Sequence, residues 1–198
     1  MKVHIPRRTA RNLLLWMQRL FLASSVTALG YCGFVLADSW AFQRHEQREL
    51  AVLLPDRPAL RPAARPVTAS GLIGRIEIDR LGLSVIVVEG TTETALRRAA
   101  GHIEGTALPG DPGHIGIAAH RDTFFRPLRK VQRNDLISLV TPPGNFSYRV
   151  VSTTITTPDD VAILEPTQKQ VLTLVTCYPF NFIGSAPQRF IVRAERIT

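Results

Sequence analysis

The chain has 198 residues, which is enough for one ordinary domain and a modest appendage. Its formal net charge is +8, but five positive charges precede the first acidic residue, Asp38, and lie in an N-terminal tail: Lys2, Arg7, Arg8, Arg11 and Arg19. The rest of the chain carries only three net positive charges. This value is ordinary for a globular domain, so nucleic acid is not expected as a partner.

A membrane segment is predicted for residues 20–37, LFLASSVTALGYCGFVLA, which contain no charged side chain. Basic residues lie only on its N-terminal side. The positive-inside rule therefore places residues 1–19 in the cytoplasm and the rest of the chain outside the membrane. Val35-Leu36-Ala37 also fits a signal-peptidase site, but the apolar run is longer than the h-region of a signal peptide, which spans about 7–15 residues. An uncleaved single-pass anchor is favoured over a cleaved signal.

Residues 38–70 are predicted to form a juxtamembrane segment and a linker. Ser39 to Leu54 could continue as a short helix, after which prolines at 55, 58, 62 and 66 alternate with arginines and favour an extended spacer. A domain boundary is expected near Ser70-Gly71, which leaves residues 71–198 for one folded domain.

The folded domain is predicted to be mainly β. Seven segments are rich in Val, Ile and Thr and end at turn-forming residues: GRIEIDRLGL, SVIVVEG, HIGIAAH, DLISLVTP, FSYRVVSTTITT, VLTLVTC and RFIVRAERI. Two short helices are expected, at Thr92 to Ala100 and Asp159 to Leu164. Seven or eight strands in this length favour a closed barrel or a sandwich, because both protect strand edges.

Two cysteines occur, Cys32 inside the apolar segment and Cys177 near the C-terminus. Geometry disfavours a disulfide between a membrane helix and a folded domain, so Cys177 is expected to be a free thiol. An unpaired cysteine in an exported protein is either a buried core residue or a group with a chemical role. Cys177 ends the strand VLTLVTC and precedes Tyr178-Pro179, and a strand end suits a nucleophile that must meet a polymer.

A cysteine nucleophile needs a base or a cation near its sulfur. His120 is the candidate base, because it closes the segment HIGIAAH and precedes a polar turn. Arg189 begins the strand that follows the loop YPFNFIGSAPQ. If that strand pairs antiparallel with the strand ending at Cys177, its guanidinium lies near the sulfur and can stabilise an oxyanion. Taken singly, a histidine in such a position is more often a surface residue than a catalyst, and Arg189 could equally be a solvated arginine at a strand end.

The other histidines fit a catalytic role less well. His4 and His45 lie in the tail and the juxtamembrane segment, out of reach of Cys177. His102 and His114 flank the Gly/Pro-rich segment GTALPGDPG and are expected to structure this loop. No HxxxH or CxxC spacing occurs, so neither a metal ion nor another cofactor is expected.

Three segments together resemble the sortase family of cysteine transpeptidases. AAHRDTFFRPL resembles the family's histidine motif, TLVTC matches its thiol motif TLxTC, and QRFIVRA resembles its arginine strand. The resemblance covers residues 71–198 and is greatest for class D sortases and related Gram-negative sortases. It implies an eight-stranded β-barrel. Ala119 and His114 depart from the glycine and asparagine that many relatives have there, but neither change removes a reacting group.

The resemblance also implies a reaction and its partners. Cys177 would attack a carbonyl in a C-terminal LPxTG-like sorting signal of an exported protein and form a thioacyl intermediate, which an amine acceptor resolves. His120 would transfer protons, and Arg189 would stabilise the oxyanion. Two alternatives stay open, namely an exported cysteine peptidase that uses water and a non-catalytic, membrane-tethered β-barrel that binds a partner. An L,D-transpeptidase is less favoured, since that family keeps its histidine and cysteine close in sequence.

Overall fold

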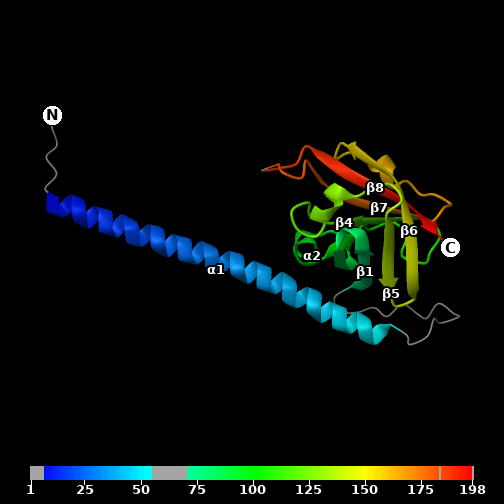
Figure 1. Cartoon of the computed structure of the whole chain (residues 1–198), viewed down its shortest axis with the longest axis horizontal. Coiled ribbons are helices and arrows are strands. Elements are labelled where there is room, and N and C mark those ends of the chain that lie inside the picture. Colours follow the sequence, from blue (N-terminus) through cyan, green and yellow to red (C-terminus); the bar gives the residue numbers. More distant parts are fainter. Residues whose placement is uncertain (1–6, 55–70, 183, 198) are drawn as a thin grey trace. The chain divides into compact units, whose positions relative to one another are not determined.

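A computed structural model describes residues 7–54, 71–182 and 184–197, which divide into two compact units at Trp40/Ala41. The elements in chain order are α1 (Arg7–Leu53), β1 (Leu72–Ile78), η1 (Asp79–Leu81), β2 (Leu83–Glu89), α2 (Glu93–Arg98), β3 (Ala100–His102), β4 (His114–Ala118), η2 (Arg126–Lys130), β5 (Leu136–Thr141), β6 (Gly144–Thr156), η3 (Val161–Leu164), β7 (Val171–Tyr178) and β8 (Gln188–Ile197) (Figure 1). The α labels denote α-helices and the η labels 3₁₀-helices.

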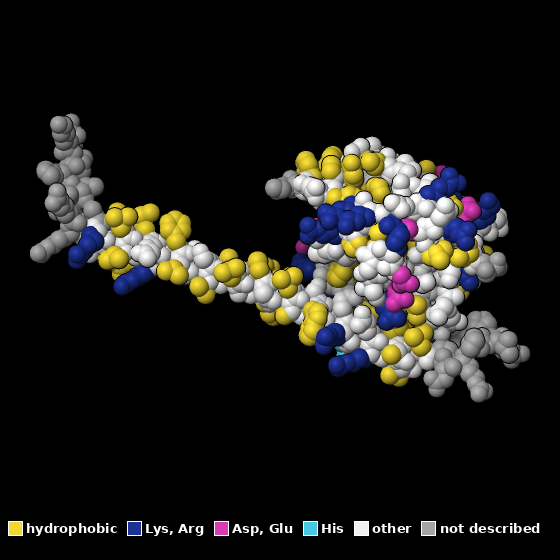
Figure 2. All heavy atoms as spheres, viewed as in Figure 1, with side chains coloured by type: hydrophobic (Ala, Val, Ile, Leu, Met, Phe, Trp, Pro, Cys, Tyr) yellow, Lys and Arg dark blue, Asp and Glu magenta, His cyan; other side chains and the backbone are white. Residues whose placement is uncertain are grey.

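Helix α1 carries the apolar segment predicted to cross a membrane. Between Arg11 and Leu53 it contains an 18-residue window with a mean hydropathy of 1.8, and none of this window is buried. Figure 2 shows hydrophobic side chains along this part of the helix. The helix is therefore long and apolar enough to span a bilayer, and it extends beyond the predicted residues 20–37 at both ends.

The last part of α1, residues 41–53, belongs to the second unit and packs on the outside of the barrel. Leu50 is only 1% exposed and forms a small apolar cluster with β2 and its neighbours, namely Leu72, Ile86, Val88 and Ala99. The Gln43 side chain donates to the Arg98 carbonyl (2.6 Å) and accepts from the Ile86 amide (3.0 Å). The segment predicted as a linker thus begins with a docked helix, whereas its proline-rich part, residues 55–70, lies outside the described residues.

The second unit contains a closed barrel with the strand order β1-β2-β3-β4-β7-β8-β6-β5. The β2–β3 and β4–β7 pairs are parallel, and the other six neighbouring pairs are antiparallel. The mainly β fold and the closed eight-stranded barrel are therefore confirmed.

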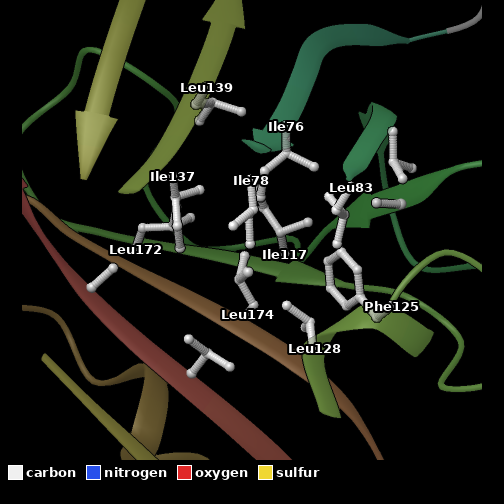
Figure 3. Close-up of a cluster of buried hydrophobic side chains, with 14 of the residues drawn as sticks. Ile76, Ile78, Leu83, Ile117, Phe125, Leu128, Ile137, Leu139, Leu172 and Leu174 are labelled. Atoms are coloured by element: carbon white, nitrogen blue, oxygen red, sulfur yellow. The ribbon is translucent and has the colours of Figure 1, made fainter. Parts of the chain in front are cut away.

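Apolar side chains from alternate strand positions fill the barrel, because successive residues of a strand point to opposite faces. Figure 3 shows Ile76, Ile117, Ile137, Leu172 and Leu174 gathered in this core, and each is completely buried. The opposite positions of β4, β7 and β8 therefore face away from the core, and the candidate site is built on that face.

Most predicted elements are present, with shifted boundaries. The seven predicted strand segments correspond to every strand except β3, whose three residues are too few to give a pattern. The first predicted helix is α2, and Thr92 caps it by accepting a hydrogen bond from the Ala95 amide (3.3 Å). The helix expected at 159–164 is the 3₁₀-helix η3, and η2 was not predicted.

Candidate active site

Cys177 and Arg189 lie directly opposite each other on neighbouring antiparallel strands. The register of β7 and β8 pairs Thr173 with Arg193, Val175 with Ile191 and Cys177 with Arg189. Residues opposite each other in such a pair project on the same face, with Cβ atoms about 4.5–5.5 Å apart. The antiparallel pairing on which the sequence argument for Arg189 depends is present, and it places Cys177 and Arg189 side by side on one face of the sheet.

His120 reaches the same edge through the parallel pairing of β4 with β7. Ala118 pairs with Val175, so His120 lies two positions beyond the last pair, at the level of Cys177. The ladder continues past the end of β4, because the Ala119 amide donates to the Val175 carbonyl (3.2 Å) and the Thr176 hydroxyl to the Ala119 carbonyl (2.7 Å). Parallel strands run to the same end of a sheet, which places the two residues together.

All three side chains belong to the face that points away from the core. The inward positions of the three strands belong to Ala119, Leu174 and Val192, each of which is buried in the core. Alternation then directs Cys177 and Arg189 to the outer face, and His120 follows the same alternation at the end of β4. Each of the three is only partly exposed, so a substrate can reach them while the barrel supports them from behind.

The guanidinium of Arg189 is partly engaged by backbone carbonyls at and just before the start of β8. Its Nη1 donates to the carbonyls of Gln188 (3.1 Å) and Ala186 (3.4 Å). Its Nε and Nη2 make no hydrogen bond within the part of the chain that the structure describes. Arg189 therefore combines an anchored nitrogen with donors that are free to meet a substrate oxygen.

His114 is the first residue of β4, at the end of the strand away from His120, and hydrogen bonds hold its ring in place. Its Nε2 lies 2.6 Å from the Thr173 hydroxyl and its Nδ1 lies 3.1 Å from the Glu165 carbonyl. Burial lowers the pKa of His114, the Glu165 carbonyl opposes this effect, and the charge of Arg193 adds to the lowering. His114 thus ties the segment after η3 to the outer face of the sheet.

His102 is also buried, and it structures the loop between β3 and β4, as expected. Its Nδ1 faces the Glu89 carboxylate (3.1 Å), and its Nε2 lies 3.0 Å from the Ala107 carbonyl and 2.9 Å from the Thr106 hydroxyl. These contacts provide partners for both ring nitrogens of His102, so its position is explained without a role at Cys177.

One side-chain group has the composition of a metal site, although none was expected from the sequence. His45, Glu46 and Glu49 of α1 place their ligand atoms within 4.8 Å of one another. They come from a single helix, and such a group is common in proteins without a bound ion. None of these residues belongs to the group formed by His120, Cys177 and Arg189.

Arg121, which follows His120 directly, is not among the predicted site residues. The sequence suggests only a polar turn there, but the Arg121 guanidinium contacts the loop between β7 and β8. A contact between residues about sixty positions apart has no signature in a single sequence.

Comparison with known proteins identifies the family. A model of the sortase domain matches residues 76–197, which is more than half of the chain. The chain belongs to the sortase family. It is 32% identical to Sortase D of Bacillus subtilis (strain 168) over 192 residues, covering 89% of this chain and 96% of that protein. It is 26% identical to Sortase A of Bacillus anthracis over 161 residues, covering 79% and 75%.

Solved sortase structures share the barrel. A sortase D5 transpeptidase from Clostridium perfringens has a TM-score of 0.59 and 32% identity, with 64% of this chain and 79% of that chain covered. Sortase C1 from Streptococcus agalactiae has a TM-score of 0.63 and 28% identity, with 69% and 73% covered. This sortase is a cysteine transpeptidase that acts at the cell surface on protein substrates with sorting signals and uses amine acceptors.

Proposed function

We propose that His120, Cys177 and Arg189 form the catalytic group of this sortase. The observation that carries the proposal is the strand register, which pairs Cys177 with Arg189 and brings His120 to the same level on the same outer face. A nucleophile, a proton carrier and a cation at one sheet edge are the groups that acyl transfer through a thioester requires.

In the first half of the reaction, the Cys177 thiolate attacks the carbonyl carbon of the scissile peptide bond. The carbonyl electrons move to oxygen, and the free donors of Arg189 stabilise the resulting oxyanion. As the oxyanion collapses, the C–N bond breaks and protonated His120 gives its proton to the leaving amine. The products are a thioester on Cys177 and the released C-terminal fragment.

In the second half, the acceptor amine attacks the thioester carbonyl. Neutral His120 takes the proton that the attacking nitrogen loses, and the Cys177 thiolate leaves as the new amide bond forms. His120 thereby returns to its protonated form. The proton that it gives up in the first half of the reaction is replaced in the second, and the enzyme ends in its starting state.

The substrate is proposed to be an exported protein with a C-terminal LPxTG-like signal, and the enzyme to be a single-pass membrane protein. In this arrangement residues 1–19 are a cytoplasmic tail, 20–37 the membrane anchor, 38–70 the juxtamembrane segment and linker, and 71–198 the extracytoplasmic catalytic domain. The apolar window of α1 supports the anchor, and the basic residues before it support this orientation. Protease added outside protoplasts or spheroplasts should digest the barrel, and protection of the barrel would contradict the orientation.

Substitution of the two cysteines tests the catalytic proposal. Cys177→Ala should abolish cleavage of a labelled LPxTG peptide, in the presence or absence of an added amine such as hydroxylamine, and should leave the barrel folded. Cys32→Ala is the matched control and should retain activity, because Cys32 lies exposed on α1. Mass spectrometry of the wild-type enzyme with excess peptide should locate the acyl group on Cys177. Normal turnover by Cys177→Ala would refute the proposal.

A further inference from the structure

The guanidinium of Arg121 binds three backbone carbonyls of the β7–β8 loop, residues 179–187. Its Nη1 donates to Pro179 (3.0 Å), and its Nη2 donates to Phe182 (2.7 Å) and Gly184 (2.9 Å). The guanidinium carbon also lies 5.9 Å from the centroid of the Phe182 ring, within the range of a cation–π contact. One side chain from the histidine segment thus holds three successive parts of a loop that begins two residues after Cys177.

The loop has a packed apolar base and an exposed tip. At the base, Phe180 makes edge contacts with Tyr178 and Phe190, with ring centroids 6.1 and 5.3 Å apart. Toward the tip, Phe182 is 46% exposed and Gly184 is exposed. Burial of apolar surface can therefore order the start of the loop, whereas the tip depends on polar contacts, and Arg121 supplies two of these, to the carbonyls of Phe182 and Gly184.

We propose that Arg121 is a positioning residue that fixes the β7–β8 loop against the histidine segment and thereby helps to hold His120 in place relative to Cys177 and Arg189. This inference rests on the proposed roles of His120, Cys177 and Arg189. The loop joins Cys177 to Arg189, and Arg121 is bonded through the backbone to His120. The side chain of Arg121 therefore links the segment that carries His120 to the loop that connects Cys177 with Arg189.

The geometry requires arginine and not only a positive charge. Two nitrogens of one planar group reach three carbonyls, which a guanidinium allows because its donors are spread over a rigid fork. An ammonium group is a compact point charge that cannot satisfy the same set of acceptors at these separations. Lysine at position 121 should therefore keep the charge and lose most of the loop order.

The test compares Arg121→Ala and Arg121→Lys with Arg129→Ala in the full-length enzyme. Arg129 is an exposed arginine of η2 whose side chain makes no hydrogen bond within the described part of the chain, so it controls for loss of one surface charge. Turnover of an LPxTG peptide is measured together with melting temperature and amide hydrogen exchange. Misplacement of reacting groups by about 1 Å can cost about 100-fold in rate.

For Arg121→Ala we expect kcat/KM to fall by about tenfold to 100-fold, mainly through kcat, with faster exchange confined to residues 180–188. Arg121→Lys should lie closer to alanine than to wild type, and Arg129→Ala should match wild type. A kcat/KM within twofold of wild type, unchanged exchange in the loop, or faster exchange throughout the barrel would each overturn the proposal. If Cys177→Ala kept its activity, the catalytic proposal would fail, while loop exchange would still report on the Arg121 contacts.

Discussion

Replacement of Arg189 by lysine separates directional oxyanion binding from general electrostatic attraction. Arg189 lies opposite Cys177, and its Nη1 is occupied by the carbonyls of Gln188 and Ala186. Stabilisation of an oxyanion would therefore come from Nε and Nη2. Lysine keeps the positive charge but offers one ammonium group, which can replace the contact to the loop or the contact to the substrate, and not both.

The magnitude follows from the number of donors lost. Removal of one oxyanion donor typically costs about 10²–10³ in rate, or roughly 3–4 kcal/mol in the transition state. We therefore expect Arg189→Lys to lower kcat/KM by about this factor, and Arg189→Ala to be at least as poor. The melting temperature should change little, because Arg189 is partly exposed and forms no ion pair within the described residues.

The assay is steady-state turnover of an LPxTG peptide with a fixed amine acceptor, with Arg193→Lys as the matched control. Arg193 lies on the same strand and the same face, and four residues place it roughly 13 Å from Arg189. Arg193→Lys should retain nearly full activity. Equal and mild effects of the two substitutions would show that Arg189 is an ordinary strand arginine.

Three further predictions concern stability. Leu50→Ala should lower the free energy of unfolding by about 2–5 kcal/mol in chemical denaturation, whereas Val52→Ala, at a position 84% exposed, should change it by less than about 0.5 kcal/mol. Gly101→Ala should cost about 1–3 kcal/mol, because the added methyl group would collide with the Gly90 carbonyl; a wild-type melting temperature would contradict this. The lowered pKa of His114 means that the unfolded chain binds its proton more readily, so stability should fall as pH drops below about 6.5. His114→Asn should weaken this dependence of the melting temperature on pH, and an unchanged pH profile would exclude His114 as its source.

The features that the sequence predicted well are those with a local pattern. Strands such as Val171–Tyr178 show alternation and β-branched residues, and the apolar run of α1 exceeds the length of a core helix. Strand β3 has only three residues, and its Gly101 is required by close backbone contact with Gly90 and not by any periodicity. The alternation of side chains between the two faces of a strand cannot be recognised in only three residues.

Docking of residues 41–53 on the barrel could not be predicted in the same way. The segment has a mixed composition, and its contact face is defined by residues far away in sequence, such as Ile86 and Ala99. Gln43, which binds the backbone of Arg98 and Ile86, looks like any exposed polar residue in the sequence. Tertiary contacts thus hold the helical start of the predicted juxtamembrane segment against the barrel.

In the candidate site, too, some features follow from local sequence patterns and others depend on tertiary contacts. Two backbone ladders determine where its main residues lie: the β7–β8 pair places Arg189 opposite Cys177, and the β4–β7 pair brings His120 to the same level. The β7–β8 pairing could be reached from the sequence, because a short loop joins the two strand ends. The β4–β7 pairing could not, because it joins strands that are separated along the chain by β5 and β6. The loop between Cys177 and Arg189 has no ladder of its own along its exposed tip, and its order depends on a guanidinium from another segment. The Arg121 contacts to this loop therefore lie outside what a strand pattern can predict.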